Sequence, residues 1–398
     1  MHWASAVSER VDTYTAIKEA ARALRVGQPE PPDLVFIFIS GHHAENFERV
    51  SAWVQEELGE AALVGCSAAG VIGGGQELEG RESLALLAGW LPGVHVRIGH
   101  VAEFLPATLD EWVEHLEIDP DEKCHFLLFA DSVTCDIDVV LQTLDAAFPD
   151  SPKAGGLANA GAEDAPAALF AHGDVLEGGA VVVALQGAVE LRTLVSQGCR
   201  PVGEPYIVTR ARGNVIKELN AGRPAEVLRR IYETLNPRDL ALFNTSMFLG
   251  MDLGSADTRS RYERGDFLIR NILGIDPESG ALAVDARVEP YQVVQFHMRD
   301  RDTAAADLHE RLRELARSPQ ATRIRGGLMF SCMGRGERLF GVANHDSDMF
   351  ARRVGPTPLA GFFCNGEVGP AGGRTSMHGY TSVFALICEP EDGGEPLL

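Results

Sequence analysis

This chain of 398 residues lacks several familiar signatures, and each absence removes a class of protein. No apolar run reaches the roughly 18 residues of a transmembrane helix, and the N-terminal stretch has no apolar segment of the signal-peptide kind. Clustered lysine and arginine are also missing, and the formal charge of −22 disfavours a surface for nucleic acid. We therefore expect a cytoplasmic protein that neither inserts into a membrane nor binds nucleic acid.

Paired cysteine motifs and nucleotide-binding loops are absent as well. The seven cysteines are scattered without a CxxC or CxxH pair, so neither a zinc ribbon nor a disulfide framework is indicated. The glycine-rich stretch 70–80 has no GxGxxG in register, and the GxxxxGK[ST] loop does not occur. The sequence therefore predicts a reducing compartment, no metal and no cofactor.

The chain does have the composition of a globular protein. Apolar residues make up 45% and charged residues 23% of it, and its length is enough for two domains with real cores. One pattern occurs three times: a buried strand, a helix, a second strand and a hairpin. We expect the strand, helix and second strand at 33–40, 43–58 and 62–68, at 124–132, 136–148 and 154–161, and at 326–332, 345–353 and 359–364.

Other segments complete the predicted fold. The stretch 198–205, GCRPVGEP, is the best boundary candidate because prolines and glycines interrupt the strand pattern there. We predict an α/β protein of two domains, with mixed β-sheets covered by helices and built from repeated strand-helix-strand-hairpin units. The domains are placed at 1–201 and 202–390, and a disordered tail at 391–398. Further helices are expected at 7–25, 224–235, 239–249 and 302–318, and a hairpin at 206–219.

Two short apolar strands near the C-terminus end in similar polar chemistry. The stretch 359–381, LAGFFCNGEVGPAGGRTSMHGYT, passes from apolar residues into polar residues and glycines, and 326–338, GGLMFSCMGRGER, does the same. Glycine lets the backbone turn sharply or approach a ligand closely, so such strands can deliver side chains to a pocket rim. A hairpin whose glycines only satisfy turn geometry would look similar. Because two strands share the pattern, we expect one common site.

The side chains at these strand ends suit a zwitterion such as an amino acid. Arg335 and Arg374 can fork onto a carboxylate, Glu367 can bind an ammonium group, and Asn365 can orient either one. The alternative is that Glu367 and one of the arginines pair with each other. The predicted pocket residues are Ser331, Cys332, Arg335, Asn365, Glu367 and His378, with Cys66 and Ser67 from the first half of the chain.

Thiol catalysis is a second possibility for the same stretch. Cys332 or Cys364 with His378 can form a nucleophilic pair for acyl transfer or hydrolysis, provided that the pKa of the thiol is lowered. The imidazole would then be oriented by Asn344, Asn365 or Glu367. A buried cysteine at a strand end is more often a small apolar residue, so ligand binding remains the favoured interpretation.

A zinc site is a weaker possibility. Cys332, Cys364 and His378 offer three ligands, but they lack the close paired spacing of a structural zinc site. Further donors are available in the stretch 344–348, NHDSD. Short polar side chains there are better suited to begin the helix that follows, because they satisfy free backbone N–H groups.

Three motifs taken together resemble the FIST family, with a FIST N domain followed by a FIST C domain. They are GCSAAGVI at 65–72, FSCMGRG at 330–336, and GFFCNGEVGP at 361–370 with HGYT at 378–381. The resemblance runs from about residue 30 to about residue 388 and implies a non-catalytic sensory module of signal transduction. It implies a small ligand, such as an amino acid or a derivative.

The resemblance also bears on partners. The chain leaves no room for a kinase, cyclase, chemoreceptor or F-box segment, so a separate signalling protein in trans is the expected partner. A scaffold that recruits proteins without any small ligand is the remaining alternative.

Overall fold

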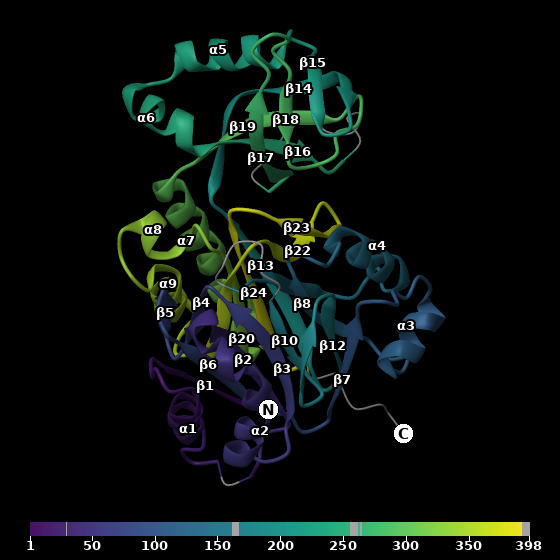
Figure 1. Ribbon diagram of the computed structural model, residues 1–398, viewed down its shortest axis with the longest axis vertical. Coiled ribbons are helices and arrows are strands. Elements are labelled where there is room, and N and C mark those ends of the chain that lie inside the picture. The colour runs from purple at the N-terminus through teal and green to yellow at the C-terminus, as the bar shows by residue number, and fades with distance from the viewer. Residues whose placement is uncertain (29, 161–166, 255–261, 263–264, 392–398) are drawn as a thin grey trace.

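The computed structural model describes residues 1–28, 30–160, 167–254, 262 and 265–391, which form a large body and a smaller barrel (Figure 1). The body is built from three consecutive units that share one order of elements: strand, helix, strand, helix, strand, hairpin, strand. This confirms the predicted α/β class and its repeated units. The first unit contains β1 (His2–Ser8), α1 (Thr13–Leu24), β2 (Leu34–Ser40), η1 (Gly41–Asn46), α2 (Phe47–Leu58), β3 (Ala62–Ala68), β4 (Gly70–Gly73), β5 (Gln76–Glu79) and β6 (Leu84–Trp90).

The second and third units follow the same plan, and the third is interrupted by the barrel. The second contains β7 (Val94–Val101), α3 (Leu109–Leu116), β8 (His125–Asp131), α4 (Ile137–Ala147), β9 (Lys153–Ala158), β10 (Ala168–Ala171), β11 (Asp174–Glu177) and β12 (Ala180–Gly187). The third begins with β13 (Glu190–Gln197). It resumes with α7 (Arg301–Arg317), η2 (Pro319–Arg323), β20 (Ile324–Cys332), α8 (Gly336–Phe340), α9 (His345–Val354), β21 (Leu359–Cys364), β22 (Glu367–Ala371), β23 (Arg374–His378) and β24 (Thr381–Cys388).

Each unit lends its hairpin to the sheet of another unit. The three six-stranded sheets have the orders β1-β6-β2-β3-β10-β11, β23-β22-β9-β8-β12-β7 and β13-β24-β20-β21-β4-β5. The hairpin of the first unit thus extends the sheet of the third, that of the second extends the first, and that of the third extends the second. This cyclic exchange covers one edge of every sheet and ties the units into a single body.

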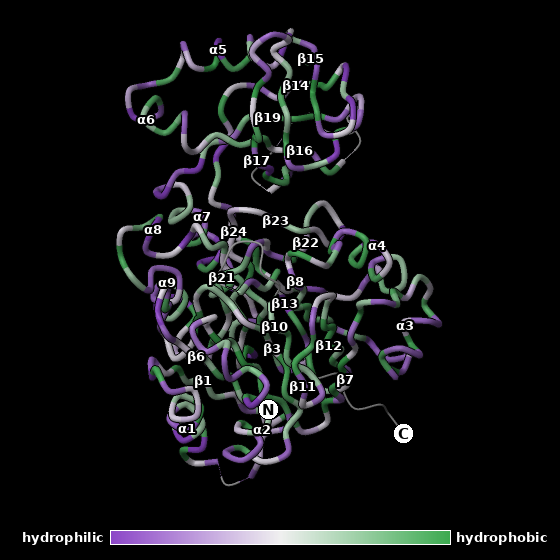
Figure 2. The backbone as a smooth tube through the Cα atoms, in the orientation of Figure 1, coloured by the Kyte–Doolittle hydropathy of each residue, from purple (hydrophilic) through white to green (hydrophobic). Residues whose placement is uncertain are grey.

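The inner faces of the three sheets meet in a common apolar core. Phe38, Phe129 and Phe330 occupy matching positions on the middle strands, and their ring centres lie 5.8 Å (Phe38–Phe129) and 6.1 Å (Phe129–Phe330) apart. Phe362 contacts all three rings at 5.2 to 6.4 Å. Helices cover the outer faces, and Figure 2 shows the apolar residues concentrated on the strands of the body. No helix among the described residues is long and apolar enough to cross a membrane.

Glycine is required where the parallel strands of each unit lie closest together. A Cβ atom on Gly65 or Gly361 would lie 1.8 Å from a carbonyl oxygen of the neighbouring strand, and one on Gly155 would lie 2.1 Å from such an oxygen. These three glycines pair with matching positions in the three units. The glycines of the GCS and GFF motifs therefore serve the packing of the sheets.

The barrel spans residues 199–299 and leaves and re-enters the body at one place. β14 and β19 pair as Cys199↔Arg299, so the two connections to the body lie side by side. The barrel contains β14 (Cys199–Arg212), β15 (Val215–Leu219), α5 (Pro224–Thr234), α6 (Pro237–Ser246), β16 (Met247–Asp252), β17 (Phe267–Ile275), β18 (Leu282–Val284) and β19 (Val293–Arg299).

Some predicted boundaries differ from the observed ones. The helix predicted at 7–25 begins only at Thr13, because 2–8 form strand β1 and Asp12 caps the helix by accepting a hydrogen bond from the Thr15 backbone N–H (2.8 Å). Val11, which lies inside the predicted helix, is 75% exposed. The helix predicted at 239–249 ends at Ser246. The stretch 198–205 is mostly strand β14, which contains the proposed division between residues 201 and 202, and residues 392–398 of the predicted tail lie outside the described residues.

Candidate functional site

The structure brings several of the predicted residues together at the carboxyl ends of β20 and β21. Cys332 and Cys364 are paired positions on these parallel strands, and Glu367 follows at the start of β22. The Cys364 thiol donates to Glu367 Oε1 (3.5 Å), while Glu367 Oε2 accepts from the backbone N–H (3.1 Å) and hydroxyl (2.6 Å) of Thr381. Burial raises the pKa of Glu367 to about 7, although the hydrogen bonds from Thr381 oppose this.

Arg335 lies close to this cluster, but its guanidinium already has a carboxylate partner. Its Nε and Nη2 atoms pair with Asp346 of α9, and both side chains are fully buried. The structure thus gives Arg335 an acidic partner other than Glu367. Arg374, at the start of β23, is exposed.

His378 is buried, and its imidazole lies against the backbone of β22. Its Nε2 atom lies 3.3 Å from the carbonyl oxygen of Gly369, and burial lowers its pKa to about 4. Among the described residues it makes no hydrogen bond to Cys332 or Cys364. Burial raises the pKa of both thiols, which is opposite to the direction that thiol catalysis requires.

Three of the other predicted residues, Cys66, Ser67 and Asn365, are engaged elsewhere in the body. Cys66 belongs to the central core. The Ser67 hydroxyl donates to the carbonyl of Asn159 (3.1 Å) and accepts from the backbone N–H of Ala168 (3.0 Å). Asn365 is exposed and donates to the Ser132 hydroxyl (3.2 Å), whereas the Ser331 hydroxyl is buried without a hydrogen-bond partner among the described residues.

A cavity of about 960 Å³ lies where the barrel meets the body. We call it the barrel–body cleft. Its barrel wall consists of α6 and neighbouring residues of β16 and β17, including Leu242, Phe248 and Ile272. The opposite wall comes from the start of α7, the loop after β20 with α8, and Tyr380, whose ring centre lies 4.1 Å from that of Phe248 and whose hydroxyl donates to Asn271 of β17.

Arg299 is the residue of this cleft whose hydrogen-bond donors are least satisfied by the described residues. It ends β19, its guanidinium carbon lies 5.1 Å from the centre of the Tyr380 ring, and a Cβ on Gly334 would lie 2.6 Å from Nη1. Its Nε and Nη2 atoms are buried and have no hydrogen-bond partner among the described residues. Buried polar groups are nearly always hydrogen-bonded, so a guanidinium in this state calls for an explanation.

The charges that line the cleft are predominantly positive. Among the described residues the lining contains four arginines, Arg238, Arg299, Arg301 and Arg338, and two aspartates, Asp300 and Asp302. This excess is unusual for a chain whose formal charge is −22. The positive charge of Arg299 also reaches Cys332, where it favours the thiolate, but burial is the larger effect on that thiol's pKa.

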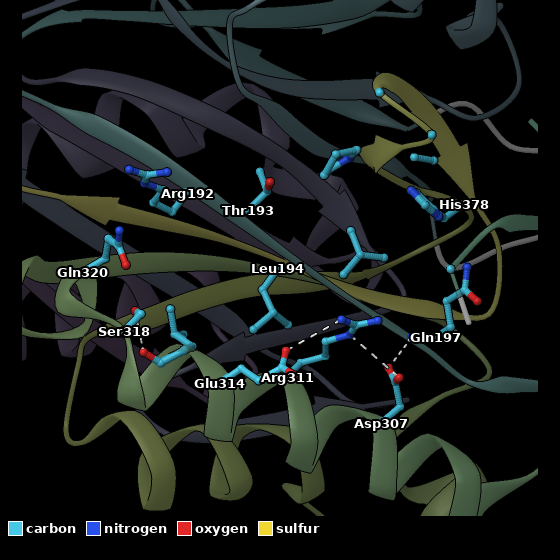
Figure 3. Close-up of a pocket in the computed structure, with 17 residues that line it drawn as sticks. Arg192, Thr193, Leu194, Gln197, Asp307, Arg311, Glu314, Ser318, Gln320 and His378 are labelled. Atoms are coloured by element: carbon cyan, nitrogen blue, oxygen red, sulfur yellow. Dashed lines mark hydrogen bonds and ion pairs between the residues drawn. The ribbon is translucent and has the colours of Figure 1, made fainter. Parts of the chain in front are cut away.

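A second cavity, of about 580 Å³, lies between α7, β13 and the hairpin β22–β23, and it contains His378 (Figure 3). Its charges are balanced. Arg311 lies between Asp307 (3.9 Å) and Glu314 (3.8 Å), and Asp307 also accepts a hydrogen bond from the Gln197 backbone N–H (2.9 Å). A third cavity, of about 570 Å³, is lined mainly by small and apolar residues. No group of three or more metal-ligating side chains occurs in the described part of the chain.

Sequence reasoning missed Arg299, Arg338 and Tyr380 as site residues. Strand β19 is an apolar strand that ends in a charged residue, which is the same pattern that predicted a site at the ends of β20 and β21. Its partner across the cleft, however, is set by the junction of barrel and body. No local sequence pattern predicts that contact.

Known family models and proteins match most of the chain. The model of the FIST N domain matches residues 33–222, and the model of the FIST C domain matches residues 224–370. An uncharacterized protein of Mycobacterium tuberculosis is 34% identical over 385 residues, which cover 96% of this chain and 98% of that protein. One from Mycobacterium bovis is 33% identical over 375 residues, or 94% and 95% of the two chains. An F-box/LRR-repeat protein of Arabidopsis thaliana is 32% identical over 111 residues, which cover 25% of this chain and 21% of that protein.

Proposed function

This chain belongs to the FIST family, whose domains are associated with sensing and signal transduction, and from that premise we propose that it binds a small carboxylate-bearing ligand in the barrel–body cleft. Among small carboxylates, an amino acid or a derivative is the favoured class. The protein then acts as a non-catalytic sensor.

The unpaired guanidinium of Arg299 is the observation that carries this proposal. A carboxylate that enters the cleft meets a side chain whose hydrogen-bonding capacity is unused among the described residues. Guanidinium and carboxylate groups form paired, charge-assisted hydrogen bonds, and these are strong where water is excluded. The Tyr380 ring beside the guanidinium limits water on one side.

The size and apolar content of the cleft support a small organic ligand. Pockets for such ligands generally measure 300 to 1,000 Å³ and combine apolar walls with a few polar anchors. Here the apolar walls come from residues such as Leu242, Phe248 and Leu339, and the cleft volume of about 960 Å³ is within that range. By contrast, Arg311 in the second cavity already has two acidic neighbours.

The residues predicted from the sequence have different roles in this proposal. Cys332 lies two residues before Gly334, which lines the cleft, and we propose that it stands behind the cleft wall rather than in contact with the ligand. Glu367 stands behind the same strand end, hydrogen-bonded to Thr381, the residue after Tyr380. For the other six, Ser331, Arg335, Asn365, His378, Cys66 and Ser67, a role in ligand binding stays a prediction.

Output is proposed to pass to a separate signalling protein. A ligand in the cleft touches both the barrel and the body, so it is placed to fix the position of one against the other. A partner that reads this junction would sense occupancy without contacting the ligand. A separate protein would then respond to the presence of a small cytoplasmic metabolite.

A thermal-shift screen tests the proposal. The purified protein is screened against amino acids, their N-acyl derivatives and small carboxylates, because a ligand that binds only the folded state raises the Tm. We expect a hit whose shift is lost in Arg299→Gln. The matched control Arg311→Gln, which alters an arginine of the second cavity, should retain the shift. If the shift survives in Arg299→Gln and is lost in Arg311→Gln, the second cavity is the site and the proposal is wrong.

A further inference from the structure

We infer that the ligand of the barrel–body cleft carries two separate acidic groups and that this cleft does not recognise an ammonium group. The inference rests on the proposed function and narrows its ligand class. It favours dicarboxylates, acidic amino acids and their N-acyl derivatives over neutral amino acids.

Arg338 supplies the second positive anchor. It lies on α8, four residues after Gly334, the glycine against which the Arg299 guanidinium packs. Both arginines line the cleft, and neither makes a hydrogen bond or an ion pair with the described residues. Arg338 is exposed, whereas the Arg299 guanidinium is largely buried, so one anchor lies deep and the other at the mouth.

The acidic side chains of the cleft are already engaged. Asp300 accepts from Arg200 (3.3 Å) and Arg238 (3.0 Å), and it also caps α7 by accepting from the Asp302 backbone N–H (2.9 Å). Asp302 accepts from Arg238 (2.7 Å) and lies 3.4 Å from Arg301. Among the described residues of the cleft, both carboxylates are therefore already paired with arginines. A ligand ammonium group would also face an excess of positive charge.

The second cavity shows the contrasting arrangement. There Arg311 stands between two carboxylates at 3.8 and 3.9 Å, distances too long for direct hydrogen bonds but short enough for charge neutralisation. An acidic ligand would meet two carboxylates beside that arginine, whereas in the barrel–body cleft Arg299 and Arg338 have no acidic partner among the described residues. Since the two unpaired arginines lie on different segments, they fit two separated groups better than a single doubly charged one.

Four ligands with five-carbon chains isolate the charge at each end. Pentanoate has one carboxylate, glutarate has two, 5-aminopentanoate has a carboxylate and an ammonium group, and glutamate has two carboxylates and an ammonium group. Titration calorimetry at fixed ionic strength gives the Kd of each. We expect glutarate and glutamate to bind about threefold to fivefold more tightly than pentanoate, since the second carboxylate pairs with an exposed arginine and exposed ion pairs are weak. 5-Aminopentanoate should bind no more tightly than pentanoate.

Substitution of each arginine shows which carboxylate of the ligand it binds. Arg338→Gln should weaken glutarate to the level of pentanoate and leave the Kd of pentanoate unchanged, whereas Arg299→Gln should weaken both ligands. Arg311→Gln is the control and should change neither. Equal affinities for glutarate and pentanoate, or tighter binding of 5-aminopentanoate, would overturn the inference while the proposed function stands. If none of the four ligands binds, the carboxylate site itself is refuted, and the inference with it.

Discussion

The buried carboxylate of Glu367 should make the protein less stable as the pH rises from about 4.5 to about 7. Its side chain is fully buried, and burial raises its pKa from the ordinary 4.5 to about 7. Between these two values the native state holds a proton that the unfolded chain has lost. The Glu367 contribution to the free energy of unfolding is therefore greatest at the acidic side of this window, falls as the pH rises through it, and is constant above it.

The size of the effect follows from the shift of the pKa. One pKa unit corresponds to 1.36 kcal/mol, so a rise from 4.5 to about 7 amounts to about 3 kcal/mol between the two ends of the window. Glu367→Gln should remove this dependence. The glutamine oxygen can accept the same hydrogen bonds from Thr381, and its neutral amide needs no proton to be buried.

Urea unfolding of the wild type and of Glu367→Gln at pH 5, 6, 7 and 8 measures the difference. At pH 5 the two proteins should have nearly equal free energies of unfolding, because both side chains are neutral in the native state. At pH 8 the variant should be more stable by up to about 3 kcal/mol. Glu77 is also buried with a pKa of about 7, but it is present in both proteins, so its contribution cancels. A difference that is independent of pH, or that grows toward acid, would refute the reasoning.

Three further predictions concern packing, charge burial and thiol reactivity. Gly361→Ala should lower the free energy of unfolding by at least about 3 kcal/mol in urea titrations, because the new Cβ would lie 1.8 Å from the carbonyl oxygen of the neighbouring strand. Asp346→Asn should cost about 3 to 5 kcal/mol in the same assay, since it leaves the buried guanidinium of Arg335 without its charged partner. Iodoacetamide should label the half-buried Cys332 slowly near neutral pH and the fully buried Cys364 only in denaturant, as followed by mass spectrometry.

Matched controls make these outcomes decisive. Gly274→Ala adds a methyl group where no atom lies within 4 Å, so it should leave stability nearly unchanged. Asp348→Asn breaks only an exposed pair with Arg352 and should cost less than about 1 kcal/mol. Equal effects in variant and control would contradict the packing and charge arguments. Rapid labelling of Cys332 in the native protein would revive the thiol-catalysis alternative.

The sequence indicated which strand ends carry the polar side chains of the site, but not which of these side chains form pairs. The strand ends that carry Cys332, Cys364 and Glu367 do converge, because neighbouring parallel strands end at the same edge of a sheet. The partner of Arg335 was not predictable, since Asp346 reaches it from a helix whose packing on the sheet no local pattern specifies. Arg299 was overlooked because its setting depends on the barrel junction.

The sequence by itself determined the repeating units of this protein. Periodic apolar residues, polar residues at helix starts and glycine-rich turns are local signals, so the strand, helix and second strand of each repeated pattern could be placed within a few residues. Strand β1 and helix α3 were missed. Tertiary structure alone decided which hairpin joins which sheet: β4 pairs with β21 across almost 290 residues, through ordinary backbone hydrogen bonds that any edge strand can make. It likewise decided that the barrel closes onto the third unit and leaves Arg299 beside Tyr380 with no acidic partner among the described residues, because the identity of a side chain does not specify its distant neighbours.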